Sequence, residues 1–368
     1  MKNYLSILKW IITLAILALL FNNCSPGFDQ TEIKNSKNSS EINQPTDSSS
    51  ETGISEENTE NEEAITHTDI FGKTIDGNNI LIKGENFPNK AIAEPLYWTS
   101  FEESDDPESD LIGYGRFKGL ADTNITAPGS NVSHRFDISR QDQNNSPTLN
   151  FGDSNELYVF KKIYYDFEID HADNMGPLGL NLKILRLWSP EGNNIYTGYQ
   201  GLEGSTGNPR TYAEYTGQST LWGKIPFIPY KWHQTEIVYK ASQVDVQDGI
   251  FTVIRDGVKL WDRKFRMRTS NKSAKYNEIA FDQISNGTGN NSLNIYYDDL
   301  YIDTTFTRIM LSDAPNLEDS RVLEVQIPLQ WSKNLIEIKL RKGAHESFKD
   351  KYLLIIDEKN EVNKVISL

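Results

Sequence analysis

The 368-residue sequence contains a single cysteine, Cys24. One cysteine cannot form an intramolecular disulfide, so packing and hydrogen bonds alone must hold the fold together. The sequence also lacks an excess of positive charge, because 37 lysines and arginines stand against 52 acidic residues and the net charge is -15. No stretch forms a basic stripe. This distribution argues against nucleic acid or anionic lipid as the ligand, and we expect no nucleic-acid partner.

Long apolar runs are absent except near the start of the chain. Residues 11–21 (IITLAILALLF) form an uninterrupted apolar run that follows Lys2 and Lys9. A run of this length suits the core of a secretory signal peptide and is too short to span a bilayer comfortably. The sequence therefore predicts an exported protein.

The apolar run is followed by Asn22-Asn23-Cys24-Ser25-Pro26. In a bacterial export context this segment resembles the lipobox of lipoproteins, whose cysteine is acylated after cleavage by the lipoprotein signal peptidase. The resemblance implies residues 1–24 as signal peptide and lipidation site. It also implies a membrane anchor outside the cytoplasm, in the outer membrane or on its periplasmic or cell-surface face. Phe21, Asn22 and Asn23 depart from the small residues usual in a lipobox, and an uncleaved membrane anchor is the alternative.

Residues 25–66 are rich in Ser, Asn, Glu and Thr, with hardly an aromatic residue and no apolar periodicity. Ten acidic residues against Lys34 and Lys37 give this stretch a charge of -8, more than half of the chain's total. Such a segment cannot bury enough apolar surface to offset its ordering entropy. We predict a disordered acidic linker that holds the body away from a lipid surface.

The body begins near residue 67, where aromatic residues become frequent and helical periodicity is lacking. Short runs with period-two alternation lie between clusters of Gly, Asn, Asp and Pro, as expected for strands of an antiparallel sandwich. Examples are residues 79–83, 157–160, 236–239, 251–254 and 294–297. About 300 residues suffice for one large sandwich and a smaller module. We predict an all-β body.

Four motifs between Trp232 and Asp303 resemble part of a concanavalin-like jelly roll, as found in polysaccharide lyases and laminin-G-type modules. They are WHQTE at 232–236, QDGIF at 247–251, RDG at 255–257 and YYDDLYI at 296–302, and residues 181–188 resemble a further strand of such proteins. Each Asp-Gly pair supplies the positive φ that a tight hairpin requires. The resemblance implies a jelly-roll sandwich over residues 95–313.

The two ends of the body resemble two halves of an immunoglobulin-like module of the IPT/TIG type. The first half is the strand, glycine and phenylalanine pattern within Thr74–Phe87, and the second lies in residues 331–340 and 352–357. The resemblance implies one small Ig-like sandwich, built from residues 67–94 and 314–368, into which the jelly roll is inserted.

A calcium site is predicted where the jelly roll opens and closes. Asp298 shares a strand face with Leu300 and Ile302, so alternation points this carboxylate inward, where an unpartnered charge is costly. A Ca²⁺ ion bound by oxygen ligands is one solution. Many carbohydrate-binding β-sandwiches place such an acid near one that follows the opening strand, and this resemblance implies Glu102 and Asp298 as structural Ca²⁺ ligands. The alternative is that Asp298 caps a turn and Glu102 is solvated.

Residues 193–232 combine many aromatic side chains with Gly, Asn, Thr and Pro. Aromatic faces stack on the apolar faces of sugar rings, while amides and arginines bind the hydroxyls, so this segment is a candidate glycan site. The ligand-binding candidates are Tyr196, Tyr199, Tyr212, Tyr215 and Trp222. The alternative is that these rings pack the core and the sheet edges.

Catalytic signatures are lacking. The Arg-x-Glu-Leu and Gln-x-His motifs of alginate lyases do not occur in the sequence. A lyase must neutralise a uronate carboxylate and supply a base and an acid, and the weak candidates for these roles are His233, Arg186 and Tyr239. Others of suitable type are Lys183, Tyr297, His134 and Arg135.

Three functions are therefore open. The first is a surface-exposed or periplasmic lipoprotein that binds carbohydrate through its jelly roll. The second is a polysaccharide-degrading enzyme on the same fold, a lyase in preference to a hydrolase. The third is a scaffold that contacts other proteins through its Ig-like module.

Substituting Cys24→Ser should abolish acylation and release or mislocalise the protein, because the thiol is the predicted lipid attachment point. Detergent partitioning and the mass of the mature N-terminus measure this directly. An unchanged mass and an unchanged partition would contradict the lipoprotein prediction.

Overall fold

The computed structural model describes residues 70–71, 79–102, 120–138, 148–168, 181–200, 208–221, 227–284 and 293–368. The predictions for Cys24, for residues 25–66 and for Trp222 fall outside these ranges. Every regular element of the described residues is a β-strand, which confirms the all-β prediction. In the same ranges, no helix has the length and apolarity needed to cross a membrane.

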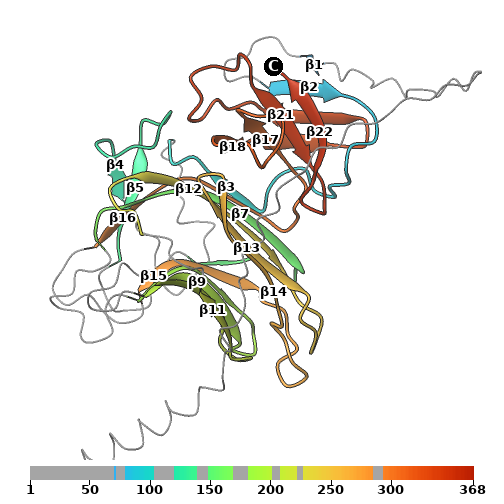
Figure 1. Cartoon of the computed structure of the whole chain (residues 1–368). Coiled ribbons are helices and arrows are strands. Elements are labelled where there is room, and N and C mark those ends of the chain that lie inside the picture. Colours follow the sequence, from blue (N-terminus) through green and yellow to red (C-terminus); the bar gives the residue numbers. More distant parts are fainter. Residues whose placement is uncertain are drawn as a thin grey trace, which may run out of the picture. The chain divides into compact units, whose positions relative to one another are not determined.

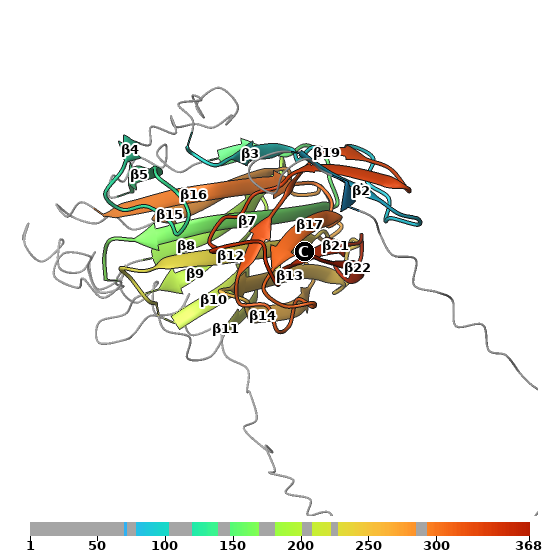
Figure 2. The same cartoon turned by 90° about the horizontal axis from the view of Figure 1, so that it is seen from above.

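Two antiparallel sheets face each other in the jelly-roll sandwich that the sequence predicts (Figure 1). The six-stranded sheet runs in the order β11 (Gln218–Leu221), β10 (Asn208–Ala213), β9 (Asn194–Gln200), β8 (Asn181–Trp188), β15 (Glu278–Ile284) and β6 (Thr148–Asn150). The eight-stranded sheet runs in the order β14 (Val258–Phe265), β13 (Gly249–Arg255), β12 (Trp232–Lys240), β7 (Glu156–Tyr165), β16 (Asn294–Asp303), β5 (Ser133–Asp137) and β4 (Leu120–Asp122), and β3 (Tyr97–Thr99) also pairs with β16. Figure 2 shows β16, β7 and β12 side by side.

The central strands β7, β12 and β16 of the eight-stranded sheet are buried almost throughout, on both faces, although they carry several polar and charged residues. In β7, Leu157, Val159 and Ile163 belong to the core between the two sheets. Tyr158 and Phe160 point the other way, into a second apolar cluster shared with the C-terminal strands. One strand therefore packs against both halves of the body.

Two further sheets of four strands each form a smaller sandwich. One sheet has β1 (Ile70–Phe71), β2 (Asn79–Lys83), β20 (Leu335–Lys339) and β19 (Ile327–Trp331), and the other has β18 (Leu323–Val325), β17 (Arg308–Ser312), β21 (Tyr352–Ile356) and β22 (Val362–Ser367). Strands β2 and β20 pair although more than 250 residues separate them. Ile80 and Ile82 of β2 share an apolar cluster with Ile309 and Leu311 of β17.

The position of β17 corrects one predicted boundary. The jelly roll was predicted to end at residue 313, but β17 pairs with β21 and packs its apolar side chains in the small sandwich. The last jelly-roll strand, β16, ends at Asp303. The change of sandwich therefore falls between Asp303 and Arg308. All residues of β17 and all but the first of β16 are buried. A buried strand pattern in a sequence does not indicate which sandwich the strand joins.

An ion pair between Lys161 of β7 and Asp282 of β15 crosses the middle of the large sandwich, and both side chains are fully buried. Asp282 also accepts hydrogen bonds from the hydroxyls of Tyr165 and Tyr297. Burial lowers the pKa of Lys161, and the charge of Asp282 opposes that shift. Burial and the charge of Asp282 together raise the pKa values of both tyrosines far above their usual range. The cluster therefore holds one compensated pair of charges and two neutral hydroxyls.

The Lys161 ammonium also donates a hydrogen bond, 3.3 Å long, to the backbone carbonyl of Ile184. Ile184 is the extra residue of a β-bulge in β8, because the register with β9 shifts between Lys183 and Leu185. A bulge leaves one residue out of the ladder, and its carbonyl needs another donor. The buried lysine supplies that donor. Asp282, with a φ of 45°, lies at the matching irregularity of β15.

Glycine is required opposite the bulge. Gly198 of β9 pairs with Lys183, and a Cβ at this position would lie 2.0 Å from the carbonyl oxygen of Leu182. Only a residue without a side chain permits this approach of the two backbones.

Breaking the buried pair should destabilise the protein strongly. Lys161→Met and Asp282→Asn should each lower the free energy of unfolding by about 3–5 kcal/mol, because each leaves a buried charge or an unmet polar group. The double variant should cost much less than the sum. Urea unfolding of the four proteins measures this coupling, and Lys259→Met, which breaks an exposed pair with Asp262, is the control. Strictly additive losses would contradict the pairing.

Candidate functional site

A row of side chains crosses the outer face of the six-stranded sheet. Its register places Ala280 of β15, Arg186 of β8, Tyr196 of β9 and Tyr212 of β10 directly opposite one another in turn. Directly opposite residues share a sheet face. The residues that follow or precede them in each strand, such as Leu187 and Ile195, lie in the core, so the row faces away from it. Four adjacent strands span about 14 Å.

The side chains of this row contact one another. The rings of Tyr196 and Tyr212 meet edge to face with centroids 5.6 Å apart. The Arg186 guanidinium lies 3.7 Å from the centre of the Trp188 ring and 5.8 Å from that of Tyr196. It donates hydrogen bonds, each 3.1 Å long, to Asn194 and to Glu214. This network fixes the guanidinium in one orientation.

Lys183 joins the row because of the bulge. Its ammonium lies 4.8 Å from the centre of the Tyr196 ring, so Lys183 and Arg186 bracket one tyrosine. Strict alternation would put Lys183 and Arg186, three residues apart, on opposite faces of the sheet. The extra residue Ile184 brings both basic side chains to the outer face. We name Lys183, Arg186, Trp188, Tyr196 and Tyr212 the outer-face cluster.

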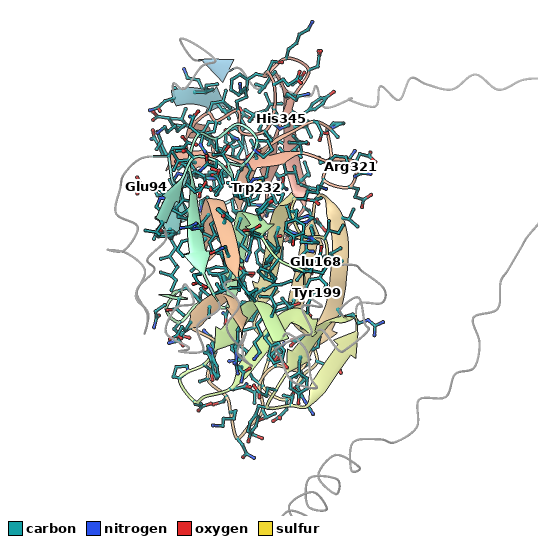
Figure 3. The ribbon with its side chains drawn as sticks, turned by 90° about the vertical axis from the view of Figure 1, so that its left-hand side faces the viewer. Glu94, Glu168, Tyr199, Trp232, Arg321 and His345 are labelled. Atoms are coloured by element: carbon teal, nitrogen blue, oxygen red, sulfur yellow. The ribbon has the colours of Figure 1, made fainter. Side chains whose placement is uncertain are left out.

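The structure brings only part of the predicted glycan site together. Tyr196 and Tyr212 belong to the outer-face cluster, and both are partly or largely covered. Tyr215 is exposed on the turn between β10 and β11, with the Lys272 ammonium 5.5 Å from its ring. Tyr199 faces the opposite way, into the core, where its hydroxyl accepts a hydrogen bond from the buried Arg255 (Figure 3). Alternation in β9 separates Tyr199 from Tyr196.

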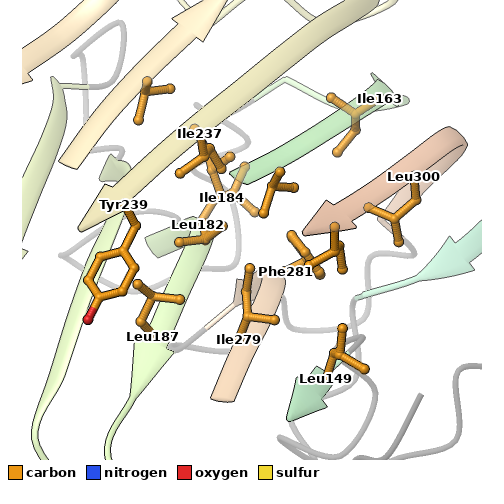
Figure 4. Packing of buried hydrophobic residues seen from close by; sticks show 14 of the residues in the cluster. Leu149, Ile163, Leu182, Ile184, Leu187, Ile237, Tyr239, Ile279, Phe281 and Leu300 are labelled. Atoms are coloured by element: carbon orange, nitrogen blue, oxygen red, sulfur yellow. The ribbon is translucent and has the colours of Figure 1, made fainter. Parts of the chain in front are cut away.

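Two of the three catalytic candidates do not face this cluster. Tyr239 is buried in the core beside Leu182 and Leu187, and burial raises its pKa far above the usual range (Figure 4). His233 is also buried, and its two ring nitrogens lie 2.8 Å from Asp256 and from the carbonyl of Ile228. Burial raises the pKa of Asp256, but the hydrogen bond and charge of His233, the backbone N–H of Gln234 and the charge of Lys231 together lower it overall. His233 therefore stabilises the Asp256-Gly257 turn after β13.

Sequence reasoning missed three members of the site environment, Trp188, Asn194 and Glu214. Trp188 lies two residues after Arg186, so alternation alone could have placed the pair on one face. Asn194 and Glu214 could not be assigned in this way, because their hydrogen bonds to Arg186 depend on the register of three strands.

Asp298, the predicted calcium ligand, is fully buried, and neither carboxylate oxygen makes a regular hydrogen bond within the described part of the chain. Burial, followed by the charge of Asp299, raises its pKa to about 8. Ser130 lies close enough to lower this pKa somewhat, without a hydrogen bond of regular geometry. Asp298 is thus a buried acid whose charge lacks a dedicated partner.

Asp299 is compensated instead. Its carboxylate pairs with Lys162 at 2.7 Å and with Arg341 at 2.7 Å, and Lys162 also pairs with Glu324 at 2.9 Å. Burial alone would raise the pKa of Asp299, but Lys162 and Arg341 lower it overall. This network joins β16 and β7 of the large sheet to the small sandwich.

The predicted direction of Asp298 is wrong. Asp298 pairs in register with Lys162, whose ammonium contacts the small sandwich, so Asp298 lies on that side of the sheet. Leu300 and Ile302 do belong to the core. A register shift between Asp298 and Tyr301 separates them, and it breaks the alternation on which the prediction depended.

Asp298 and Glu102 both lie near the loop of residues 130–132. Glu102 accepts hydrogen bonds from the backbone of Asn131 and Val132, and Asn131 follows Ser130, the neighbour of Asp298. The unmet oxygens of Asp298 fit an oxygen-binding cation. Glu102 is already satisfied, and the described residues hold no group of three acidic, His or Cys side chains suited to a metal. Backbone carbonyls or the Ser130 hydroxyl would have to complete such a site.

No protein-family model and no curated protein matches the sequence. Similar solved structures include alginate lyase Aly36B, with 12% identity, coverage of 60% of this chain and 95% of that one, and a TM-score of 0.42. The PL-14 alginate lyase from Aplysia kurodai has 15% identity, 57% and 99% coverage and a TM-score of 0.37. The endo-beta-1,4-glucuronan lyase from Trichoderma reesei has 10% identity, 58% and 97% coverage and a TM-score of 0.38. Similarities at these values assign no activity to the chain.

The raised pKa of Asp298 predicts a pH-dependent stability in the presence of a chelator. Between about pH 5 and pH 8 the folded protein keeps this proton while the unfolded chain has released it. Stability should therefore fall as pH rises, by up to about 1.4 kcal/mol per pH unit, and Asp298→Asn should remove that part of the slope. Urea unfolding at several pH values measures both proteins. Identical slopes would contradict the assignment.

The same pair of proteins tests the cation. If Ca²⁺ binds at Asp298, the ion stabilises the fold by about 2.7 kcal/mol at a hundredfold excess over its dissociation constant. The melting temperature of the wild type should then rise with Ca²⁺ at pH 8, and Asp298→Asn should not respond. A wild-type melting curve indifferent to both calcium and chelator would reject the ion.

Proposed function

We propose that the protein binds a polysaccharide across the outer face of the six-stranded sheet. The observation that carries this proposal is the row of Arg186, Tyr196 and Tyr212 on three adjacent strands, with Lys183 added to the same face by the bulge. A row that crosses the strands arranges rings and cations along one line. Successive sugar units of an extended chain could contact successive residues of that line.

The chemistry of the cluster suits sugar rings. Tyrosine and tryptophan faces contact the C–H faces of pyranoses, while a fixed guanidinium donates to ring hydroxyls or to a carboxylate. Arg186 is oriented by Asn194 and Glu214 before any ligand arrives, so little conformational entropy is lost on binding. The two cations favour a chain that carries uronate carboxylates over a neutral one.

A second candidate function is β-elimination from such a uronate chain. In that reaction a base removes the C5 proton, the C4–O4 bond breaks, O4 takes up a proton, and a C4–C5 double bond forms. The proximity of the Lys183 ammonium to Tyr196 supports this candidate, since the two residue types can exchange protons with a substrate. Arg186 would then neutralise the carboxylate. Tyr239 and His233, both turned elsewhere, take no part.

Three further proposals complete the account. A calcium ion at Asp298 would stabilise the place where the jelly roll meets the small sandwich. Glu102, the second predicted ligand, would have to exchange its hydrogen bonds with Asn131 and Val132 for the ion. The small sandwich is proposed to be an Ig-like module of the IPT/TIG type. The body is proposed to be tethered outside the cytoplasm through a lipid on Cys24.

Tyr212→Ala should weaken binding of an oligouronate about tenfold, because a half-buried ring that stacks on the sugar is lost. Arg186→Ala should reduce the preference for oligouronates over neutral oligosaccharides. Isothermal titration calorimetry of the full-length protein in detergent measures both, and Tyr230→Ala, which removes an exposed tyrosine far from the row in sequence, is the matched control. Ultraviolet absorbance of the unsaturated product reports elimination in the same samples.

Equal affinities of wild type and both variants would reject the outer face as the glycan site. Binding without ultraviolet absorbance would leave the binding function and remove the lyase candidate.

A further inference from the structure

A cavity of about 460 Å³ lies where the large sheet meets the small sandwich, away from the outer-face cluster. Its walls come from β12, from the β13–β14 hairpin and from β17, together with the loop between β17 and β18 and the turn between β21 and β22. Ile254, Val258, Leu317 and Leu323 supply apolar surface. The charged lining residues are three cations and two carboxylates: Lys259, Arg308, Arg321, Glu236 and Glu318. The size is that of a small-molecule site.

Two of these charged residues, Glu236 and Arg308, are buried and only partly satisfied. Glu236 accepts a hydrogen bond of 2.7 Å from Tyr158, and the Arg308 guanidinium lies 3.6 Å from the same carboxylate oxygen. Arg308 also donates to Asn360, and its guanidinium carbon lies 3.8 Å from the centre of the Tyr158 ring. The second oxygen of Glu236 and the Nε of Arg308 have no hydrogen-bond partner among the residues described. Buried groups of this kind are costly unless a ligand or water completes them.

The mouth of the cavity is shaped by close backbone packing and carries a cation. Gly257, at the tip of the β13–β14 hairpin, has a φ of 73°, and a Cβ there would lie 2.3 Å from the carbonyl oxygen of Ser320. The hairpin therefore presses directly on the loop that carries Arg321. Arg321 is exposed, and its guanidinium donates to the backbone carbonyls of Glu318 and Ser320 (Figure 3). Within the described ranges no carboxylate forms an ion pair with Arg321.

We propose that this cavity binds a single hexuronate, either free or at the end of a glycan. The apolar walls contact the C–H face of the ring, Glu236 accepts from hydroxyls, and Asn360 and Arg308 donate to them. Arg321 binds the carboxylate at the mouth. A hexuronate has an apolar C–H face, hydroxyls that donate and accept, and a carboxylate. The lining offers an apolar wall, groups that accept and donate, and a cation, which match these three parts. The site is separate from the outer-face cluster and does not depend on it.

The test is titration of the full-length protein in detergent with glucuronate and with glucose, followed by saturation-transfer NMR. Glucuronate should bind saturably, and glucose at least tenfold more weakly. Val258→Trp fills the cavity from an exposed strand position, and Arg321→Gln removes the mouth cation without touching a buried group. Each should weaken glucuronate binding at least tenfold. Tyr230→Ala, which removes an exposed tyrosine outside the cavity lining, should leave it unchanged.

Every outcome decides the proposal. Absence of glucuronate binding to the wild type, or binding unaffected by Val258→Trp, overturns the site. Loss of binding in Tyr212→Ala instead would assign the monosaccharide to the outer face. Equal affinity for glucose and glucuronate, unchanged by Arg321→Gln, would overturn the carboxylate recognition.

Discussion

A lysine and an aspartate, both without contact to solvent, are paired across the middle of the large sandwich. Neither charge is tolerable there alone, so Lys161 and Asp282 fix the two sheets in one relative register. The same ammonium holds the carbonyl of Ile184, the residue that the bulge expels from the β8 ladder. The bulge in turn brings Lys183 and Arg186 to one face. A buried interaction is thus linked to the placement of the cluster through which we propose that a glycan binds, although Lys183 and Tyr196 are themselves only 6% and 7% exposed.

Buried charges also lie on the other side of the eight-stranded sheet, where it meets the small sandwich. Its outer face is covered by the small sandwich, through an apolar cluster around Tyr158 and Tyr301. Charges enter this junction in compensated groups, such as Lys162 with Asp299 and Glu324. Where compensation is incomplete, at Asp298 and at the pair of Glu236 and Arg308, the structure has unmet oxygens and nitrogens. Those two places are where we propose an ion and a sugar.

Much of the fold follows from local patterns in the sequence. Period-two runs gave the strands of the all-β body, and the Asp256-Gly257 pair does form a positive-φ turn between β13 and β14. Tyr196 and Tyr212, two of the predicted ligand-binding residues, lie directly opposite each other on one face of the six-stranded sheet. One error has a clear physical cause. A register shift in β16 breaks the alternation between Asp298 and Tyr301, so Asp298 was assigned to the wrong face. A bulge in β8 likewise brings Lys183 and Arg186 to one face, which strict alternation would not predict.

Other features could not be predicted from the local sequence, because they depend on contacts between strands that are distant in the chain. Tyr239 and His233 are residue types with catalytic uses, but their partners, Tyr276 and Asp256, make them part of the core and of a turn. The predicted end of the jelly roll at residue 313 included β17, whose sequence does not show which sandwich it joins. Only the pairing of β17 with β21 decides which sandwich it joins.

The buried Lys161 positions the outer-face cluster through its hydrogen bond to the carbonyl of Ile184 in the bulge. The direct measurement is the oligouronate affinity of Lys161→Met, taken at a temperature where near-ultraviolet circular dichroism shows the variant to be folded. The account predicts a loss of about tenfold or more, although Lys161 is 0% exposed and cannot touch the ligand. A folded variant that binds as tightly as the wild type would contradict it.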